Sequence, residues 1–268
     1  MQVVQRAGVI TLHEHDPVGL RVALATDLLL QCDVGLRCLR LQQVRPGDAP
    51  ARGQRLQERT EPGPQRGGYV GTWSWTAPSL IKSKRFYPAG CSSAEARLRF
   101  YASQFPVVEV DSSYFAMPSA ANSQRWVERT PADFIFTVKA FRLLTGHQTP
   151  PEAFPADMQP LLPAPKGRAK NLYYRDVPAE LRDELWRRFI EAVGPLREAG
   201  RLRAVHFQFA PWVASSPEWL AHVEDCVDRM RGHTVAVEFR NHTWMVGQAA
   251  ARTIAWEREL DVVHVVTD

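Results

Sequence analysis

Charged side chains stand inside otherwise apolar, strand-like runs of this sequence, and two of these runs carry two polar residues at a spacing of two. Glu109 and Asp111 belong to one run, Glu238 and Arg240 to another, and Lys139 ends a third. Alternate residues of a strand face the same side of a sheet, so each spaced pair shares one face. Burying such charges is costly unless they are paired or hydrogen-bonded. We therefore expect one polar cluster.

The residue types in this cluster are suited to acid–base chemistry. Glu109 and Glu238 are the natural candidates for general acid and general base. Two nearby carboxylates would raise the pKa of Lys139, so we assign it to stabilising an anionic substrate or transition state rather than to forming a Schiff base. Arg240 completes the predicted catalytic set. The structural alternative is an ion-pair lattice in which Lys139 and Arg240 only neutralise the two glutamates.

Further polar and aromatic residues follow the same runs, where loops meet solvent and ligand. His206 and His264 lie inside apolar runs and are interpreted as buried core histidines. The predicted substrate-binding residues are Trp75, Asp111, His147, Gln208, His242, Trp244 and Asp268.

Six β-branched and aromatic runs predict strands of a buried parallel sheet. They cover residues 69–72, 107–110, 134–138, 204–209, 234–239 and 262–266. Amphipathic segments between them predict helices at 93–104, 119–129, 178–199 and 248–259, and one more from Ser216 to just before Gly232. This alternation indicates βα units. No glycine-rich phosphate loop follows any strand, so a barrel is favoured over a dinucleotide-binding sheet. In either fold the strand ends would bring the polar cluster together.

Two regions lack this alternation. Residues 1–66 are predicted to be an N-terminal extension and linker, because Arg45 to Gly68 is rich in Pro, Gly, Gln and Arg. Within it, residues 18–39 are compatible with a short helix, and the cluster at 13–16 is interpreted as exposed. The connection 140–177 is long and proline-rich, which is typical of a lid, a binding loop or a disordered segment. Its run 166–174 mixes cations with aromatic residues, a combination that can hold single-stranded nucleic acid. The alternative is a solvated turn whose two tyrosines pack on the barrel.

Composition narrows the class of protein. The chain has 268 residues, of which 45% are hydrophobic and 23% charged, and a net charge of +4. Four scattered cysteines do not form a disulfide framework, and no segment reaches the roughly 20 apolar residues needed to span a bilayer. Arginines are interleaved with acids, so the charge permits nucleic acid as a partner without favouring it. We expect a reduced, cytoplasmic protein with a small-molecule ligand, and the sequence identifies no cofactor or metal site.

Several separated strings resemble one known family, the domain-of-unknown-function 72 (DUF72, YecE-like) proteins. They are VGTWSW (70–75), FYPAG (86–90), VEVDSSYFAMPS (108–119), FTVKAFRLLTGH (136–147), FQFAPWV (207–213) and AVEFRNHTW (236–244). The resemblance covers about residue 69 to 268 and implies a TIM-type (β/α)8 barrel of unestablished activity. The residues that match the family's characteristic polar positions are Glu109, Lys139, His147, Gln208, Glu238, Arg240 and Trp244.

The chain also departs from the family pattern. Trp73 stands where the family usually has a small residue, and residues 1–66 have no counterpart. Two further βα units that the family carries after the sixth strand are absent. We therefore expect a partial barrel over 67–268, truncated after its sixth strand and open at its edges, behind a poorly ordered N-terminal extension.

Three functions fit these observations. The leading hypothesis is an enzyme that uses the strand-end glutamates, lysine and arginine for acid–base chemistry on a small polar or anionic substrate. The second is a metal-dependent phosphodiesterase acting on nucleic acid, although the histidines lack a compact ligand spacing. The third is a barrel that binds a ligand without catalysis.

Overall fold

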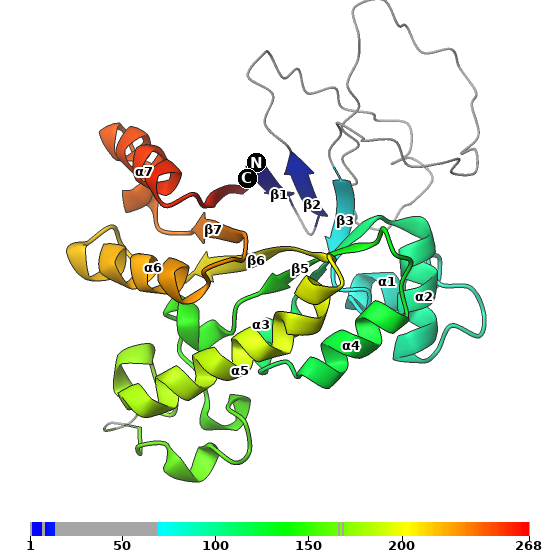
Figure 1. Ribbon diagram of the computed structural model, residues 1–268, viewed down its shortest axis with the longest axis horizontal. Coiled ribbons are helices and arrows are strands. Elements are labelled where there is room, and N and C mark those ends of the chain that lie inside the picture. The colour runs from blue at the N-terminus through cyan, green and yellow to red at the C-terminus, as the bar shows by residue number, and fades with distance from the viewer. Residues whose placement is uncertain (1, 7–8, 14–68, 166, 168, 268) are drawn as a thin grey trace, which may run out of the picture.

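The computed structural model of the chain describes residues 2–6, 9–13, 69–165, 167 and 169–267. A curled sheet of six parallel strands forms its centre (Figure 1). These strands are β3 (Tyr69–Trp73), β4 (Val107–Val110), β5 (Ile135–Lys139), β6 (Leu202–Phe209), β7 (Val235–Phe239) and β8 (Val263–Thr267). Each pairs with the next in sequence order. The prediction of six parallel strands is confirmed.

A hairpin joins the two outer strands of this sheet. Its strands are β1 (Gln2–Arg6) and β2 (Val9–His13), which pair antiparallel. β2 pairs antiparallel with β3, and β1 pairs parallel with β8, so the strand order closes into a ring. The sequence-based prediction of open sheet edges is therefore wrong. The extension that was predicted to be poorly ordered contains these two strands. The ring also differs from a (β/α)8 barrel, because two of its strands form a hairpin.

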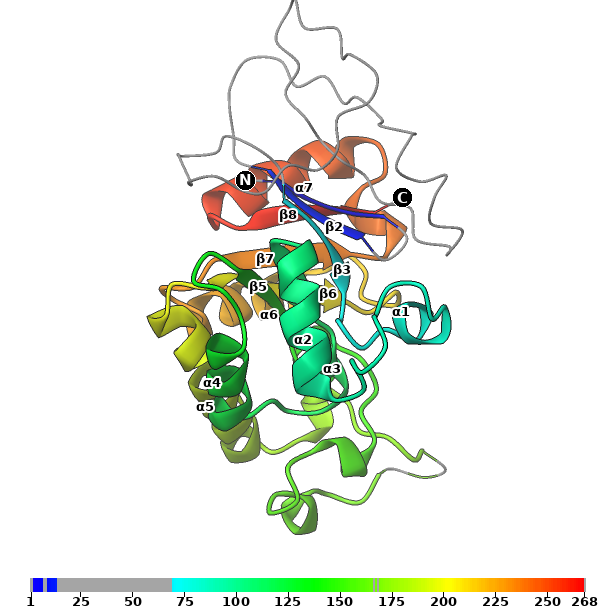
Figure 2. The same cartoon turned by 90° about the vertical axis from the view of Figure 1, so that its right-hand side faces the viewer.

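Helices pack on the outer side of the six parallel strands (Figure 2). The longer ones are α2 (Ala94–Gln104), α4 (Ala120–Glu128), α5 (Ala179–Glu198), α6 (Pro217–Arg229) and α7 (Gln248–Glu259), and the short ones are α1 (Pro78–Lys82) and α3 (Ser112–Phe115). Serine side chains cap three of the longer helices by accepting a backbone N–H three residues on, and they are Ser93, Ser119 and Ser216. The predicted helix starts are thus correct. The segment 18–39 lies outside the described residues.

Two apolar layers cover the two faces of the sheet. The larger lies between sheet and helices, where Phe207, Phe209 and Trp186 are fully or almost fully buried. The smaller lies on the concave inner face and consists of Val107, Ala204, Ala236, Val263 and Val265. Strand alternation requires this division, because successive side chains point to opposite faces. The inner apolar layer does not extend to the carboxyl ends of the strands, and polar residues lie there.

The long connection 140–177 is ordered along most of its length. It contains the 3-10 turns η1 (Arg142–Thr145), η2 (Pro151–Ala153), η3 (Gln159–Leu161) and η4 (Tyr174–Asp176). Thr149 and Leu172 exchange two backbone hydrogen bonds of 2.8 Å, and Phe154 and Met158 are buried. Lys166 and Arg168 of the basic aromatic run lie outside the described residues. No helix in the described part of the chain is long and apolar enough to cross a membrane.

Candidate functional site at the strand ends

The concave face of the sheet changes from apolar to charged toward the carboxyl ends of its strands. Above the inner apolar layer come Glu109 on β4, His206 on β6 and Glu238 on β7, each two residues beyond a member of that layer. Register explains why they meet, since His206 pairs with Ala236 and Gln208 with Glu238 along β6 and β7. The predicted polar cluster is therefore present, with His206 at its centre.

His206 lies between two buried carboxylates. Its Nδ1 is 2.7 Å from Oε2 of Glu109, with which it forms a hydrogen bond. Its Nε2 is 3.0 Å from Oε2 of Glu238, a contact with the distance of an ion pair but without hydrogen-bond geometry. All three side chains are almost completely inaccessible to solvent. Only a doubly protonated imidazolium places a positive charge between these two negative groups.

Electrostatics support that protonation state. Burial by itself would lower the pKa of His206, but the nearby carboxylates of Glu109 and Glu238 outweigh it and raise the pKa to about 9. For Glu238, burial is outweighed by His206 and by Arg240, and the pKa falls to about 2. His206 and Lys139 likewise lower the pKa of Glu109 against its burial. The trio is therefore charged at neutral pH, and neither glutamate holds a proton to donate.

Lys139, Asp111, Gln208 and Arg240 lie nearer to solvent around this trio. Lys139 Nζ is 2.9 Å from Oδ1 of Asp111 and 3.7 Å from Oε1 of Glu109. Gln208 Nε2 donates to Oε1 of Glu238 at 2.7 Å, and the Arg240 Nε donates to the same oxygen. Burial would lower the pKa of Lys139, yet Glu109 and Asp111 raise it, as predicted. These residues surround the trio with neutralising and hydrogen-bonding partners.

His147 lies beside these surrounding residues and is neutral. Its ring meets Tyr114 at 5.1 Å and Trp212 at 5.8 Å, both edge to face. Burial, followed by the charges of Arg142, Lys139 and Arg240, lowers its pKa to about 4. Two cations from the end of β5 and the start of η1, and a third that follows β7, thus act on one uncharged imidazole.

A hydroxyl group fixes which nitrogen of His147 is free. Thr145 Oγ1 donates its proton to the backbone carbonyl of Arg142 at 3.1 Å, and it lies 2.9 Å from Nδ1 of His147. Since the hydroxyl has one proton, the contact with the ring requires Nδ1–H as the donor. The lone pair of the neutral ring is then on Nε2, which makes this nitrogen the available base.

Several predicted site residues lie elsewhere. Trp75 is buried against Trp126 of α4, and Trp244 stacks on Phe239 at 4.0 Å with its Nε1 bonded to the Val213 carbonyl. Both pack in the outer core, because the loops after β3 and β7 fold back onto the helices. The prediction that they contact substrate receives no support from these positions.

Two further histidines from the sequence analysis also lie apart from the cluster. His242 is exposed in η5 (His242–Trp244). His264 faces outward, where its Nδ1 lies 3.0 Å from Glu257 of α7, so it does not join the strand-end cluster. Asp268 lies outside the described residues, as do residues 14–16 of the N-terminal cluster.

Sequence reasoning missed Arg142 and Tyr114. Arg142 begins η1, directly after β5, and its guanidinium lies over the Tyr114 ring at 5.3 Å from the centroid. Its Nε is buried and has no hydrogen-bond partner within the described residues. Their positions in the sequence could have identified them, because both residues follow strands that carry predicted site residues.

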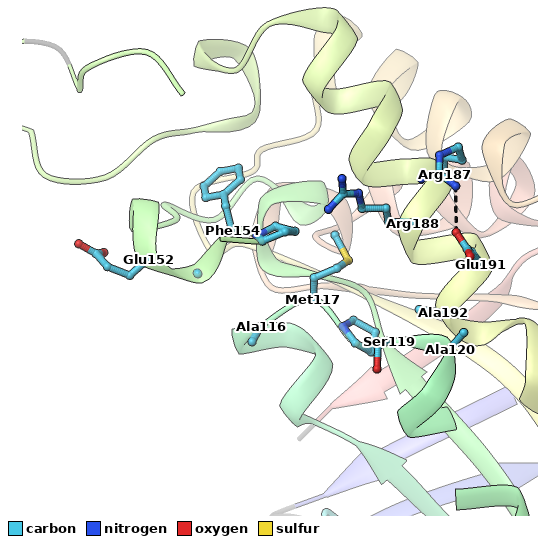
Figure 3. Close-up of a pocket in the computed structure, with 13 residues that line it drawn as sticks. Ala116, Met117, Ser119, Ala120, Glu152, Phe154, Arg187, Arg188, Glu191 and Ala192 are labelled. Carbon is cyan, nitrogen blue, oxygen red and sulfur yellow. Dashed lines mark hydrogen bonds and ion pairs between the residues drawn. The ribbon is translucent and has the colours of Figure 1, made fainter. Parts of the chain in front are cut away.

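Two cavities open away from the charged cluster. One, of about 470 Å³, lies between α4, the N-terminal part of the long connection and α5 (Figure 3). Its Arg187 is paired with Glu191 across the α5 surface, at 2.9 Å. The other, of about 620 Å³, lies beyond Gly146 and Trp212, next to His147. Neither is lined by Glu109, His206 or Glu238. In the described parts of the chain, no three His, Cys, Asp or Glu side chains are placed to hold a metal ion.

Comparisons with known proteins agree with this fold. The sequence profile of the family described as "Protein of unknown function DUF72" matches residues 69–268. The UPF0759 protein YunF of Bacillus subtilis (strain 168) is 29% identical over 200 residues, which cover 75% of this chain and 60% of YunF.

Solved structures share this fold at lower identity. A DUF72 family protein of Thermotoga maritima MSB8 superposes with a TM-score of 0.52 at 23% identity, covering 75% of this chain and 64% of the other. One of Enterococcus faecalis V583 gives 0.50 at 22%, covering 64% and 58%. The chain thus spans roughly three fifths of the length of these relatives. Since the family profile covers most of the chain, it belongs to the DUF72 family of proteins of unknown function.

Proposed function

We propose that the strand-end cluster binds a small anionic substrate and that His147 exchanges a proton with it. The observation that carries this proposal is that Lys139 and Arg142 both lie over the Tyr114 ring, which His147 contacts. Together with Arg240 they lower the pKa of His147 through their charges. An anion placed among three cations gains charge-assisted hydrogen bonds. It would also cancel the charges that depress the pKa of His147, and so bring Nε2 toward the range useful for acid–base catalysis.

The roles in this proposal differ from those that the sequence suggested. Glu109 and Glu238 are held ionised by His206, and each already accepts a hydrogen bond from a neighbouring side chain. They act as positioning residues, which fix Lys139 and Arg240 through contacts with their carboxylates. Lys139 contacts the anion, as the sequence suggested, and Arg240 and Arg142 join it. His147 takes the acid–base role.

Two other functions remain as alternatives. A barrel that binds an anion without turnover would use the same cations, and activity alone separates it from an enzyme. A metal-dependent phosphodiesterase would need a ligand cluster, and the described residues offer none. Its other support, the basic aromatic run, includes Lys166 and Arg168, whose positions are not described.

The test follows His147 by NMR of the imidazole ring, with His147→Asn to identify its signal. Without added anion, His147 should titrate with a pKa of about 4. Sulfate, which stays a dianion through this range, should raise that pKa by about one unit or more relative to chloride at equal ionic strength. The change Arg142→Gln should raise the pKa in the absence of sulfate and reduce the sulfate effect. Arg252→Gln, an exposed arginine on α7, is the matched control and should change neither.

The results of this titration and of an activity screen distinguish the proposed functions. A His147 that titrates near 6.5 without sulfate, or one whose pKa sulfate leaves unchanged, would refute the anion site. Catalysis is then tested with a panel of small carboxylates and phosphate monoesters. Turnover that His147→Asn abolishes supports the enzyme, whereas saturable binding without turnover across the panel supports the non-catalytic barrel.

A further inference from the structure

The cavity of about 620 Å³ beside His147 is lined mainly by aromatic and charged side chains. Four aromatic side chains line it, and they come from the long connection, the β6–α6 loop and α6: Tyr173, Tyr174, Trp212 and Trp219. Two arginines, Arg175 and Arg182, lie at the same cavity with one acid, Glu218. Its volume lies within the range typical of small-molecule sites, roughly 300–1,000 Å³.

The aromatic walls are fixed in place before any ligand binds. Trp212 is 49% exposed, yet its Nε1 donates to the Gly146 carbonyl at 3.0 Å. Tyr174 accepts a hydrogen bond from Trp186 Nε1, also at 3.0 Å. Gly146 has φ +78°, and a Cβ there would lie 2.6 Å from the Trp219 ring. Glycine therefore lets Trp219 pack directly against the backbone, which produces a rigid wall and reduces the entropy cost of binding.

The charge at this cavity favours an anion. Arg182 lies over the Tyr174 ring, 4.8 Å from its centroid, which holds the guanidinium at the wall. His222, which packs edge to face on both Tyr174 and Trp219, is neutral because burial lowers its pKa. Two arginines then face one glutamate, which leaves positive charge beside aromatic surface.

We propose that this cavity is a binding site for a planar aromatic anion, distinct from the strand-end cluster. The aromatic part stacks on the exposed indole of Trp212, and the anionic group meets Arg182. Exposed aromatic surface on a fixed indole favours flat ligands through ring stacking. Arginine favours carboxylate or phosphate through its forked donors. Trp212 also touches His147, so the two sites share one wall.

The experiment measures calorimetric binding of three probes to the full chain. 2-Naphthoate carries both features, 2-naphthylmethanol lacks the charge, and cyclohexanecarboxylate lacks the aromatic ring. We expect 2-naphthoate to bind best, by about tenfold over either of the others. Trp212→Leu should weaken 2-naphthoate by about tenfold, and Arg182→Gln should weaken it without affecting 2-naphthylmethanol.

Matched variants separate this site from other surfaces. Phe115 is exposed but lies outside the cavity, so Phe115→Leu should leave the binding of 2-naphthoate unchanged, as should Arg252→Gln. Equal affinity for 2-naphthoate and cyclohexanecarboxylate would overturn the proposal, as would binding that survives Trp212→Leu or no binding at all. Loss of binding in Arg142→Gln would instead place the probe at the strand-end cluster. The sulfate titration of His147 is read separately, so either proposal can fail alone.

Discussion

Replacing His206 by glutamine tests whether the buried trio is charged. Glutamine has a similar size and can still hydrogen-bond, but it cannot place a positive charge between Glu109 and Glu238. The variant therefore leaves two buried carboxylates without the cation that separates them. Leaving a buried charge without its partner is among the more destabilising single changes known.

The expected magnitude comes from linkage between proton binding and folding. The pKa of His206 is about 9 in the folded chain, against 6.5 for an unperturbed histidine. Because the folded value is the higher one, the stabilisation is fully present below pH 6.5 and is lost as the pH rises through 9. One pKa unit corresponds to about 1.4 kcal/mol, so the charged histidine contributes about 3 kcal/mol. The lowered pKa of Glu238 reflects the same ion pair and is not added.

Urea unfolding of both proteins at a series of pH values provides the assay. The difference in unfolding free energy between them should be about 3 kcal/mol near pH 6 and should shrink by most of that amount above about pH 9. Subtracting the unfolding free energy of one protein from that of the other cancels the contributions of the other groups that titrate in this range. His222→Gln is the matched control, because His222 is buried with a lowered pKa. Its stabilisation is present above pH 6.5 and is lost as the pH falls, so its slope has the opposite sign.

One result would refute this reasoning. If the difference between the native chain and His206→Gln stays constant from pH 6 to pH 9.5, His206 is neutral in the fold. The trio would then be a hydrogen-bonded core group without net attraction, and the ionised state assigned to Glu109 and Glu238 would have to be abandoned.

Three more changes have outcomes fixed by packing. Gly71→Ala should prevent β3 from pairing normally with β4, because its Cβ would lie 2.1 Å from the Val107 carbonyl oxygen, and circular dichroism should show loss of cooperative unfolding. Gly194→Ala should instead stabilise α5 by roughly 0.5–1 kcal/mol in the same assay, because nothing crowds that position. Trp244→Ala should cost about 3–5 kcal/mol by urea unfolding, since the fully buried indole stacks on Phe239; a cost below about 1 kcal/mol would contradict the packing described.

The sheet and its helices were accessible from the sequence, because hydrophobic periodicity reports burial directly. The apolar run at 204–209 and the capping serine at 216 each gave the element that the structure contains. The hairpin at 2–6 and 9–13 was not predicted. Two short runs containing Val3, Val4, Val9 and Ile10 on either side of two residues were a hairpin signal, but the polar composition that follows them masked it.

The residues of the candidate site were predicted better than the contacts among them. Spacing brought Glu109, Lys139 and Glu238 to one face, which follows from strand alternation alone. That His206 lies between the two glutamates depends on the register of neighbouring strands, which a single sequence does not specify. The burial of Trp244 was not predicted for a related reason: the direction of a loop after its strand depends on what it can pack against, here Phe239 and Trp256.

The backbone bridge between Thr149 and Leu172 brings together the two ends of the segment between them. Residues paired in this way lie about 5.5 Å apart at Cα, so the chain leaves the barrel scaffold and returns to it at one point. A two-residue turn could span that gap. Shortening would remove the buried Phe154 from Phe141 and erase part of the smaller cavity. It would keep Tyr173 and Tyr174, which follow the bridge.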